Sequence, residues 1–234
     1  YPDADEAMLK NISFKATPGT TTAFIGSTGS GKSTLINLIP RFFDATSGEI
    51  YVDGVNIKDA SVTLLRNRIG YVPQKGMLFS GTIKSNLMLG NDSLTEEEML
   101  TAAKISQSLD FIESKEKGFN SPISQGGSNV SGGQKQRLSI ARAIAKNPEI
   151  YIFDDSFSAL DFKTDAALRK ALFKHAENAT ILIVAQRIST IMNADNIIVL
   201  NEGQIVGRGT HKELMKNCKI YQEIALSQLK EEEL

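Results

Sequence analysis

Apolar residues in this chain follow two spacings, one typical of strands and the other of helices. Four continuous apolar runs predict buried strands: Thr22–Ile25, Ile150–Phe153, Thr180–Ala185 and Asn196–Leu200. Between these runs, apolar residues recur every three or four positions, as in Thr34–Phe43, and this spacing predicts helices. Because strands that alternate with helices form a mostly parallel sheet covered on both faces, the pattern predicts an α/β fold.

Shorter patterns predict a smaller antiparallel part. Apolar and polar residues alternate around Leu9, Ile12 and Phe14, and a turn follows at Pro18-Gly19, which together predict an antiparallel strand at a sheet edge. Two further short strands and the turn between them are expected at Glu49–Val52, Ile69–Val72 and Asp53-Gly54.

The middle of the chain is richer in Glu, Ala, Leu and Lys. Residues Ser93–Lys115 predict a helical insertion, in which Thr95 and Glu98 have the spacing of a capping box. We therefore expect one domain in which a helical subdomain interrupts a core with an antiparallel β subdomain. The helical subdomain is expected at 75–147, and the core at 1–74 and 148–234.

Charge and composition narrow the class of protein. The formal net charge is -1 and the Lys and Arg residues are scattered, so no basic stripe is available and we expect no nucleic-acid partner. No run approaches the ~20 apolar residues that a membrane-spanning helix requires. Since the chain begins at Tyr1 in the middle of a motif, we expect an excised domain that reaches any membrane through a partner or a segment not included.

A glycine-rich loop lies between the first buried strand and the helix after it. Its residues satisfy the phosphate-binding pattern G-x-x-x-x-G-K-[ST], and Thr34 follows directly: Gly26, Ser27, Thr28, Gly29, Ser30, Gly31, Lys32 and Ser33. Such glycines let backbone N–H groups turn toward phosphate oxygens, and the helix N-terminus adds partial positive charge. Lys32 would bridge the β- and γ-phosphates, and the Ser33 hydroxyl would bind Mg²⁺. An ordinary glycine-rich turn is the alternative.

An acidic residue stands where a metal–phosphate site needs one. Asp154 closes the strand Tyr151-Ile152-Phe153, as expected of a carboxylate that binds Mg²⁺ beside a phosphate loop. Aspartates at strand ends are also common turn residues, so Asp154 indicates a metal site only in combination with the glycine-rich loop.

A further cluster identifies a family. Val130 precedes Ser131, Gly132, Gly133 and Gln134, and this run resembles the signature sequence of ATP-binding cassette (ABC) proteins, which ordinarily begins with Leu. The resemblance implies that the segment binds the γ-phosphate of the nucleotide held by the opposite domain of a dimer. Ser131 and Gln134 also have capping-box spacing, and a capped helix start with two glycines is compatible with both roles.

Other matches occur in family order along the chain. Gln74 resembles the Q-loop glutamine that contacts Mg²⁺ and faces the membrane domain, and Ser158 and Asp161 resemble the D-loop at the dimer interface. Tyr1 resembles the aromatic residue that stacks on adenine. The run Leu78–Ile83 is similar to exporter-type members, although alone it is also compatible with a hydrophobic turn.

Two residues depart from the family pattern. Asp155 stands where the family has the glutamate that acts as general base, and its side chain is one methylene shorter. Because a misplacement of about 1 Å can cost on the order of a hundredfold in rate, Asp155 predicts a weakened site. Gln186 stands where the family has the switch histidine, and it can donate a hydrogen bond but carries no charge. Either Asp155 or Gln186 alone is also compatible with sequence drift that leaves the activity intact.

Together these residues resemble the degenerate half of a heterodimeric exporter. The resemblance implies a P-loop fold, ATP and Mg²⁺ as ligands, a second and non-identical cassette as partner, and a transmembrane domain upstream. It places the domain at the cytoplasmic face of a membrane. A regulatory nucleotide-binding module without turnover and a soluble ABC ATPase acting in repair or translation remain as alternatives.

Overall fold

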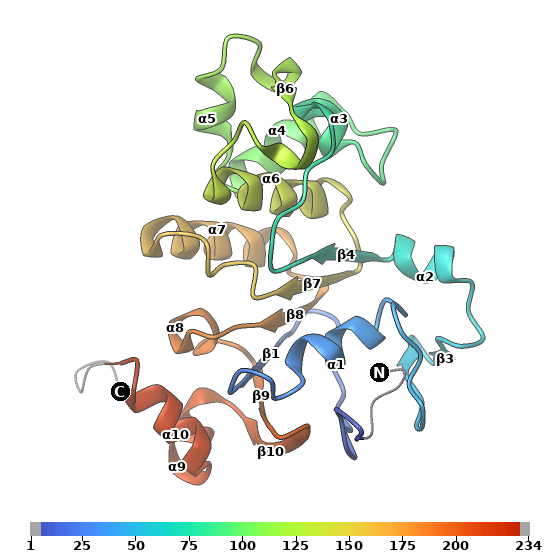
Figure 1. The fold of residues 1–234 in the computed structure, drawn as a ribbon, viewed down its shortest axis with the longest axis vertical. Coiled ribbons are helices and arrows are strands. Elements are labelled where there is room, and N and C mark those ends of the chain that lie inside the picture. The colour runs from blue at the N-terminus through green and yellow to red at the C-terminus, as the bar shows by residue number, and fades with distance from the viewer. Residues whose placement is uncertain (1–5, 230–234) are drawn as a thin grey trace. The chain divides into compact units, whose positions relative to one another are not determined.

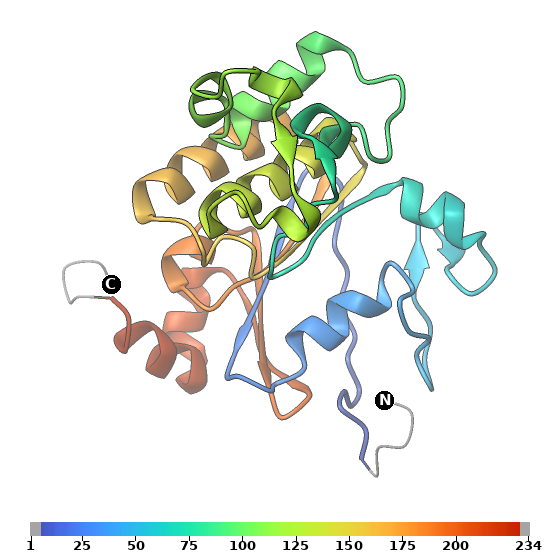
Figure 2. The same ribbon diagram turned by 45° about the horizontal axis from the view of Figure 1, so that its top comes forward.

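A computed structural model describes residues 6–229, which form two compact units (Figures 1 and 2). The first unit contains the described residues up to Ile69 and those from Thr180 onward, and the second contains Gly70–Ala179. These units are defined by packing, and the functional division at residues 74 and 148 stays a prediction.

The first unit is built on a mostly parallel sheet. Its neighbouring strands, in order, are β10 (Gln204–Gly209), β9 (Asn196–Asn201), β1 (Thr21–Gly26) and β8 (Thr180–Val184). Strand β1 is parallel to both β8 and β9, whereas β10 is antiparallel to β9. The apolar runs of the three parallel strands are buried, so the predictions of strands at these runs are confirmed.

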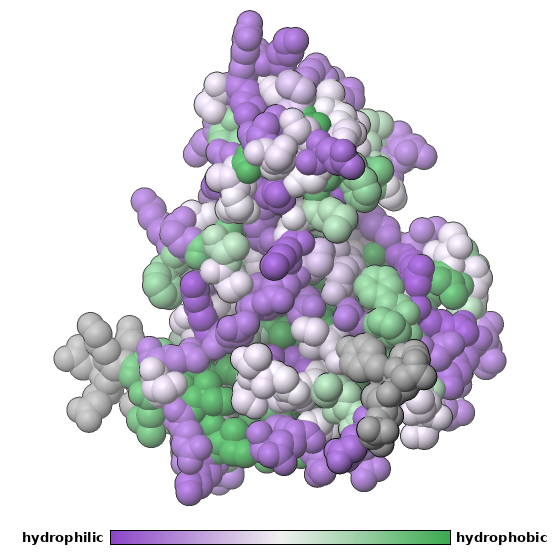
Figure 3. All heavy atoms as spheres, in the orientation of Figure 1, coloured by the Kyte–Doolittle hydropathy of each residue, from purple (hydrophilic) through white to green (hydrophobic). Residues whose placement is uncertain are grey.

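Helices of the first unit pack against this sheet. Helix α1 (Lys32–Leu38) contacts β1 and β8, α9 (His211–Asn217) contacts β10, and α10 (Lys219–Leu226) contacts α9 and β1 (Figures 1 and 2). The shorter helices are α2 (Val62–Asn67) and α8 (Ile188–Ile191). Hydrophobic residues gather on the visible surface of the C-terminal helices (Figure 3).

Two predictions for the first unit were wrong. The segment around Leu9, Ile12 and Phe14 contains no strand, because Asn11 has a φ of 54° that breaks the extended run. The helix expected at Thr34–Phe43 ends at Leu38, shortly before Pro40, which has no N–H to continue a helical hydrogen-bond ladder.

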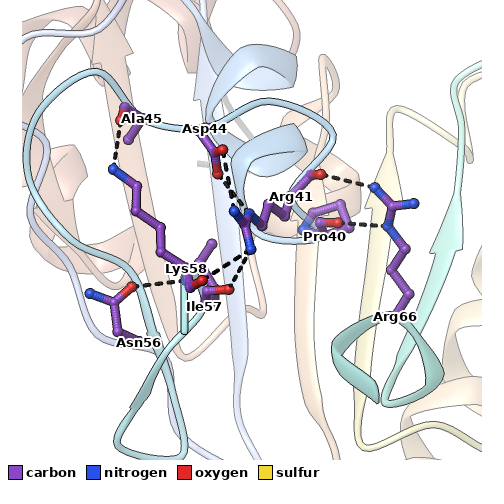
Figure 4. A network of polar contacts seen from close by, with 8 residues as sticks. All are labelled: Pro40, Arg41, Asp44, Ala45, Asn56, Ile57, Lys58 and Arg66. Carbon is purple, nitrogen blue, oxygen red and sulfur yellow. Dashed lines mark hydrogen bonds and ion pairs between the residues drawn. The ribbon is translucent and has the colours of Figure 1, made fainter. Parts of the chain in front are cut away.

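The antiparallel part is a hairpin that we only partly predicted. Asp53-Gly54 joins β2 (Tyr51–Val52) to β3 (Val55–Asn56), so the turn leads into a strand that the sequence pattern had not suggested. Two arginines hold the segment that follows α1, one by bonding the end of the hairpin and the other from α2 (Figure 4). Arg41 donates to the carbonyl oxygens of Ile57 and Lys58 at 3.2 Å and pairs with Asp44, and Arg66 donates to the carbonyl oxygens of Pro40 and Arg41.

The second unit is mostly helical. Its helices are α3 (Ile83–Leu87), α4 (Glu96–Ile105), α5 (Leu109–Glu113), α6 (Gly132–Ala145) and α7 (Phe162–His175), with short 3-10 turns at Gly118–Asn120 and Gln125–Gly127. Its strands are β4 (Ile69–Val72), which lies next to β7 (Ile150–Asp154), and the antiparallel pair β5 (Gly81–Thr82) and β6 (Pro122–Ile123).

Helix α6 is central to this helical layer, since it contacts both α3 and α4. The predicted helical insertion is confirmed, and so is the capping box, in which Thr95 and Glu98 each accept the other's backbone N–H. The predicted fold class, an α/β fold with a mostly parallel core sheet and smaller antiparallel sheets, is confirmed. No helix within residues 6–229 is long and apolar enough to cross a membrane.

Candidate functional site

The glycine-rich loop joins β1 to α1 and turns sharply at both ends. Gly26 has a φ of 153°, and a Cβ atom there would collide with the carbonyl oxygen of Leu200 on the neighbouring strand β9. Gly31 has a φ of 95° and immediately precedes α1. Because L-residues with side chains rarely adopt such backbone angles, the glycines of the motif have a structural reason to be glycines. The arrangement is the strand, loop and helix that a phosphate cradle requires.

Lys32 lies across the loop that it follows. Its ammonium group donates to the carbonyl oxygens of Gly26 and Ser27 at 2.9 and 2.8 Å and to the Ser30 hydroxyl at 3.3 Å. The side chain is mostly buried, so these oxygens stabilise the positive charge of the Lys32 ammonium group next to the loop backbone. Phosphate oxygens carry more negative charge than carbonyl oxygens, so an anion in the loop would compete well for this ammonium group.

Two buried aspartates lie at the end of β7 in the second unit: Asp154 is its last residue and Asp155 follows it. Asp154 accepts a hydrogen bond from the Tyr71 hydroxyl at 3.4 Å, and Asp155 accepts one from Gln74 Nε2 at 3.0 Å. Burial, together with the nearby charge of Asp154 and this hydrogen bond, raises the pKa of Tyr71, which therefore stays a neutral donor. The structure thus brings together Gln74 and Asp155, two residues that the sequence singled out separately.

The backbone on either side of Gln74 is held by two side chains that sequence reasoning missed. The Ser156 hydroxyl donates to the Val72 carbonyl at 2.8 Å. Gln136, on α6, donates to the Pro73 carbonyl at 3.2 Å and accepts from the Gly76 N–H at 2.7 Å. A detectable signal was present, because Gln136, like Ser139, is a polar residue on the mostly apolar buried face of α6. The Q-loop is therefore hydrogen-bonded to the helix that carries the signature segment.

The signature segment begins α6 as its spacing predicted. Ser131 Oγ accepts from the Gln134 N–H at 3.2 Å, and Gln134 Oε1 accepts from the Ser131 N–H at 3.0 Å. A Cβ atom added to Gly132 would meet nothing within 4 Å, and one added to Gly133 would meet only the Ala159 carbonyl at 3.7 Å. Packing within the described residues therefore does not require these two glycines.

The D-loop residues have contacts of their own. Ser158 Oγ donates to the Asp155 carbonyl at 2.8 Å, so it closes the turn that follows the aspartate pair. Asp161 caps α7 by accepting the Thr164 N–H at 2.9 Å, and this hydrogen bond lowers the pKa of its carboxyl group. Both residues stabilise local structure, whatever else they contact in an assembly.

Gln186 follows β8 in the first unit, and its side chain is exposed. Its carbonyl accepts a hydrogen bond from Gln228, a residue near the end of the chain that sequence reasoning also missed. Tyr1, the predicted adenine-stacking residue, lies outside the described residues.

The predicted Mg²⁺ ligands are Ser33, Gln74 and Asp154. Among residues 6–229 no three His, Cys, Asp or Glu side chains gather as a protein-only metal site would require. A hydroxyl, an amide oxygen and one carboxylate are the donor types that Mg²⁺ takes when substrate phosphates supply other ligands. The chemistry of the predicted donor set therefore fits this ion.

Comparisons with known proteins agree with these motifs. A family model described as ABC transporter matches residues 9–158. An uncharacterized ABC transporter ATP-binding protein of Mycobacterium tuberculosis is 48% identical over 231 residues, which cover 97% of this chain and 39% of the relative. A Staphylococcus aureus protein, proposed to be a multidrug export ATP-binding/permease protein, is 47% identical over 224 residues, which cover 96% of this chain and 39% of that protein.

A solved structure has a closely similar fold. A bacterial Atm1-family ABC exporter with ATP bound matches with a TM-score of 0.94 and 36% identity over 99% of this chain and 41% of that one. The chain therefore spans about two fifths of the length of these relatives. It belongs to the ABC transporter family and is one of that family's ATP-binding domains.

Proposed function

We propose that this chain is the ATP-binding domain of a membrane exporter, and that its own site holds ATP but hydrolyses it slowly. The observation that carries the second part is the environment of Asp155. Its short carboxylate is buried and accepts a hydrogen bond from Gln74 at 3.0 Å, so it is held toward the Q-loop. A general base must reach the attacking water, and a shorter side chain held in this way is poorly placed to do so.

The phosphate loop supplies the binding function. Lys32 would exchange its carbonyl partners for phosphate oxygens, and loop residues from Gly26 to Thr34 would surround the β- and γ-phosphates. Ser33, Gln74 and Asp154 would hold Mg²⁺, which supplies charge neutralisation on the phosphates when it is bound. Gln186 would donate a hydrogen bond to the γ-phosphate without the positive charge of a histidine.

The signature segment would serve a different nucleotide. Ser131, Gly132, Gly133 and Gln134 would contact ATP held by a second cassette in a head-to-tail dimer, with Ser158 and Asp161 at the interface. The lack of any packing requirement for Gly132 and Gly133 supports this role. Since the site of this chain is weakened while its signature is intact, the partner cassette would be non-identical. A transmembrane domain upstream would place the pair at the cytoplasmic face.

Titration calorimetry with Mg·ATP and a phosphate-release assay on the purified chain test this proposal. We expect binding with slow turnover, and we expect Lys32→Ala to lose most of the affinity because it removes the cation from the loop. Lys174→Ala, on the surface of α7 and outside the motifs, is the matched control and should change neither measurement. Rapid turnover by the chain alone would contradict the weakened site. A complete lack of turnover even with the partner cassette would instead favour a regulatory module.

A further inference from the structure

Gln228 makes a paired hydrogen bond with the segment that carries Gln186. Its side-chain Nε2 donates to the Gln186 carbonyl at 2.8 Å, and its Oε1 accepts from the Ile188 N–H at 2.9 Å. One amide side chain therefore satisfies backbone groups on both sides of Arg187. Neighbouring strands of a sheet exchange the same paired N–H and C=O hydrogen bonds, but here the side-chain amide of Gln228 takes the place of the second backbone.

The C-terminal helix that precedes Gln228 is firmly anchored in the first unit. Tyr221 of α10 is fully buried, and its hydroxyl lies 2.8 Å from Nδ1 of His211 on α9. The turn after α10 continues this order, because the Gln228 N–H donates to the Ala225 carbonyl at 3.0 Å. The packing of α10 and the turn after it therefore hold Gln228 in place, and with it the start of the side chain that carries the amide.

We propose that Gln228 is a positioning residue that fixes the backbone on which Gln186 is carried. This inference rests on the proposed role of Gln186 at the γ-phosphate. Residues 185–187 lie between β8 and α8 outside regular secondary structure, so a side-chain contact to this segment helps to set its path. By holding the Gln186 carbonyl and the Ile188 N–H, Gln228 lets the exposed amide of Gln186 meet the γ-phosphate at a lower cost in conformational entropy.

A neighbouring glutamine offers a direct contrast. Gln222, on α10, donates to the Met215 carbonyl at 2.7 Å, so it connects the two C-terminal helices to each other. Both side chains bind backbone groups, but Gln228 binds the segment of Gln186 whereas Gln222 binds the end of α9. This difference separates a role in positioning from a role in stability.

Amide hydrogen exchange in the nucleotide-free, full-length protein tests the contact itself. Gln228→Met keeps the length of the side chain but removes both hydrogen bonds, so the Ile188 amide should exchange about threefold to tenfold faster. Gln222→Met should leave Ile188 exchange unchanged. Equal acceleration by the two variants would mean that Gln228 only stabilises the C-terminal helices, and no acceleration by either would overturn the proposal.

Nucleotide affinity of the same variants tests the consequence. ADP lacks the γ-phosphate, so Gln228→Met should weaken binding of a non-hydrolysable ATP analogue by about threefold to tenfold while ADP affinity stays the same. Combined with Gln186→Ala, it should cause little additional loss, because both changes remove the same contact. If Gln186→Ala alone changes nothing, the proposed role of Gln186 is wrong. If Gln186→Ala weakens analogue binding and Gln228→Met does not, the positioning role is wrong.

Discussion

At the scale of single residues, Asp155 has an unusual backbone. Its φ is 47°, in the left-handed region where aspartate is better tolerated than most residues with side chains. The side chain is 6% exposed, and its carboxylate accepts the amide of Gln74. Backbone and side chain together therefore hold this carboxylate in one direction, which makes the position sensitive to a change in length.

Restoring the family pattern should increase turnover only if both departures are corrected. Asp155→Glu extends the carboxylate toward the water, and Gln186→His restores a group that can carry charge. We expect the double variant, in the assembled dimer, to raise the rate of phosphate release at this site by more than the product of the two single effects. Single-turnover kinetics measure this rate of phosphate release. Strictly multiplicative effects would show that the two residues act independently.

The predicted site residues come from local motifs, whereas the side chains that support them could not be predicted in this way. Gln74 and Asp155 each match a short pattern, and both were expected near the nucleotide. Gln228 contacts residues 40 and 42 positions earlier, and Gln136 contacts residues 60 and 63 positions earlier. No spacing rule covers contacts of that separation, because they depend on how the elements pack.

At the scale of elements, the Q-loop and α6 form one connected piece of the second unit. Gln136 is 1% exposed, and its amide satisfies the Pro73 carbonyl and the Gly76 N–H. A Cβ atom at Gly76 would lie 3.0 Å from the Gln136 Cα atom, so the two backbones are in close contact there. A displacement of the Q-loop would therefore also displace α6, the helix that Ser131 caps.

Replacing Gln136 with an apolar residue should loosen this connection. Gln136→Leu leaves the two backbone groups without their partner, which should lower the free energy of unfolding by about 1–3 kcal/mol. Urea denaturation of the purified chain measures this value. Gln125→Leu, at an exposed position of the same unit, is the matched control and should change it by less than about 0.5 kcal/mol. Equal effects would indicate that the buried amide contributes nothing specific.

Elements with strong local signals were predictable, and those without them were not. The capping boxes at Thr95 and Ser131 gave the starts of α4 and α6, because a cap and its partner are only three residues apart. The alternation at Leu9–Phe14 suggested a strand, but the Lys10 N–H donates to the carbonyl of Gly203, in the turn between β9 and β10, at 2.8 Å, and the segment forms no strand. Strand pairing depends on the partner strand, which an alternating pattern alone does not reveal.

At the scale of the whole molecule, the motifs are divided between the two compact units. The phosphate loop and Gln186 belong to the first unit, and the aspartate pair, Gln74 and the signature segment belong to the second. The chain also spans only about two fifths of the exporters it resembles. In the proposed function, the signature segment is the part of this chain whose role most depends on a second cassette.

Ser131→Arg should separate the two nucleotide sites of that assembly. The long cationic side chain would occupy the space in front of Gly132 and Gly133, where the γ-phosphate of the partner's ATP is proposed to lie. We expect the ATPase rate of the assembled pair to fall at least about tenfold. Nucleotide affinity of the purified chain should be unchanged, because its own phosphate contacts lie at the loop around Lys32.

The matched control for this change is Ser131→Ala. Both substitutions remove the hydroxyl that accepts the Gln134 N–H, so both should cost the helix about 1 kcal/mol in capping. Only arginine adds bulk in front of the glycines, so only Ser131→Arg should lower the activity of the pair at least about tenfold, while Ser131→Ala retains much of it. Equal losses in both variants would mean that activity requires the Ser131 hydroxyl, as helix cap or as nucleotide contact, and not the space in front of the glycines. Full activity of the arginine variant would show that this segment does not contact the partner's nucleotide at all.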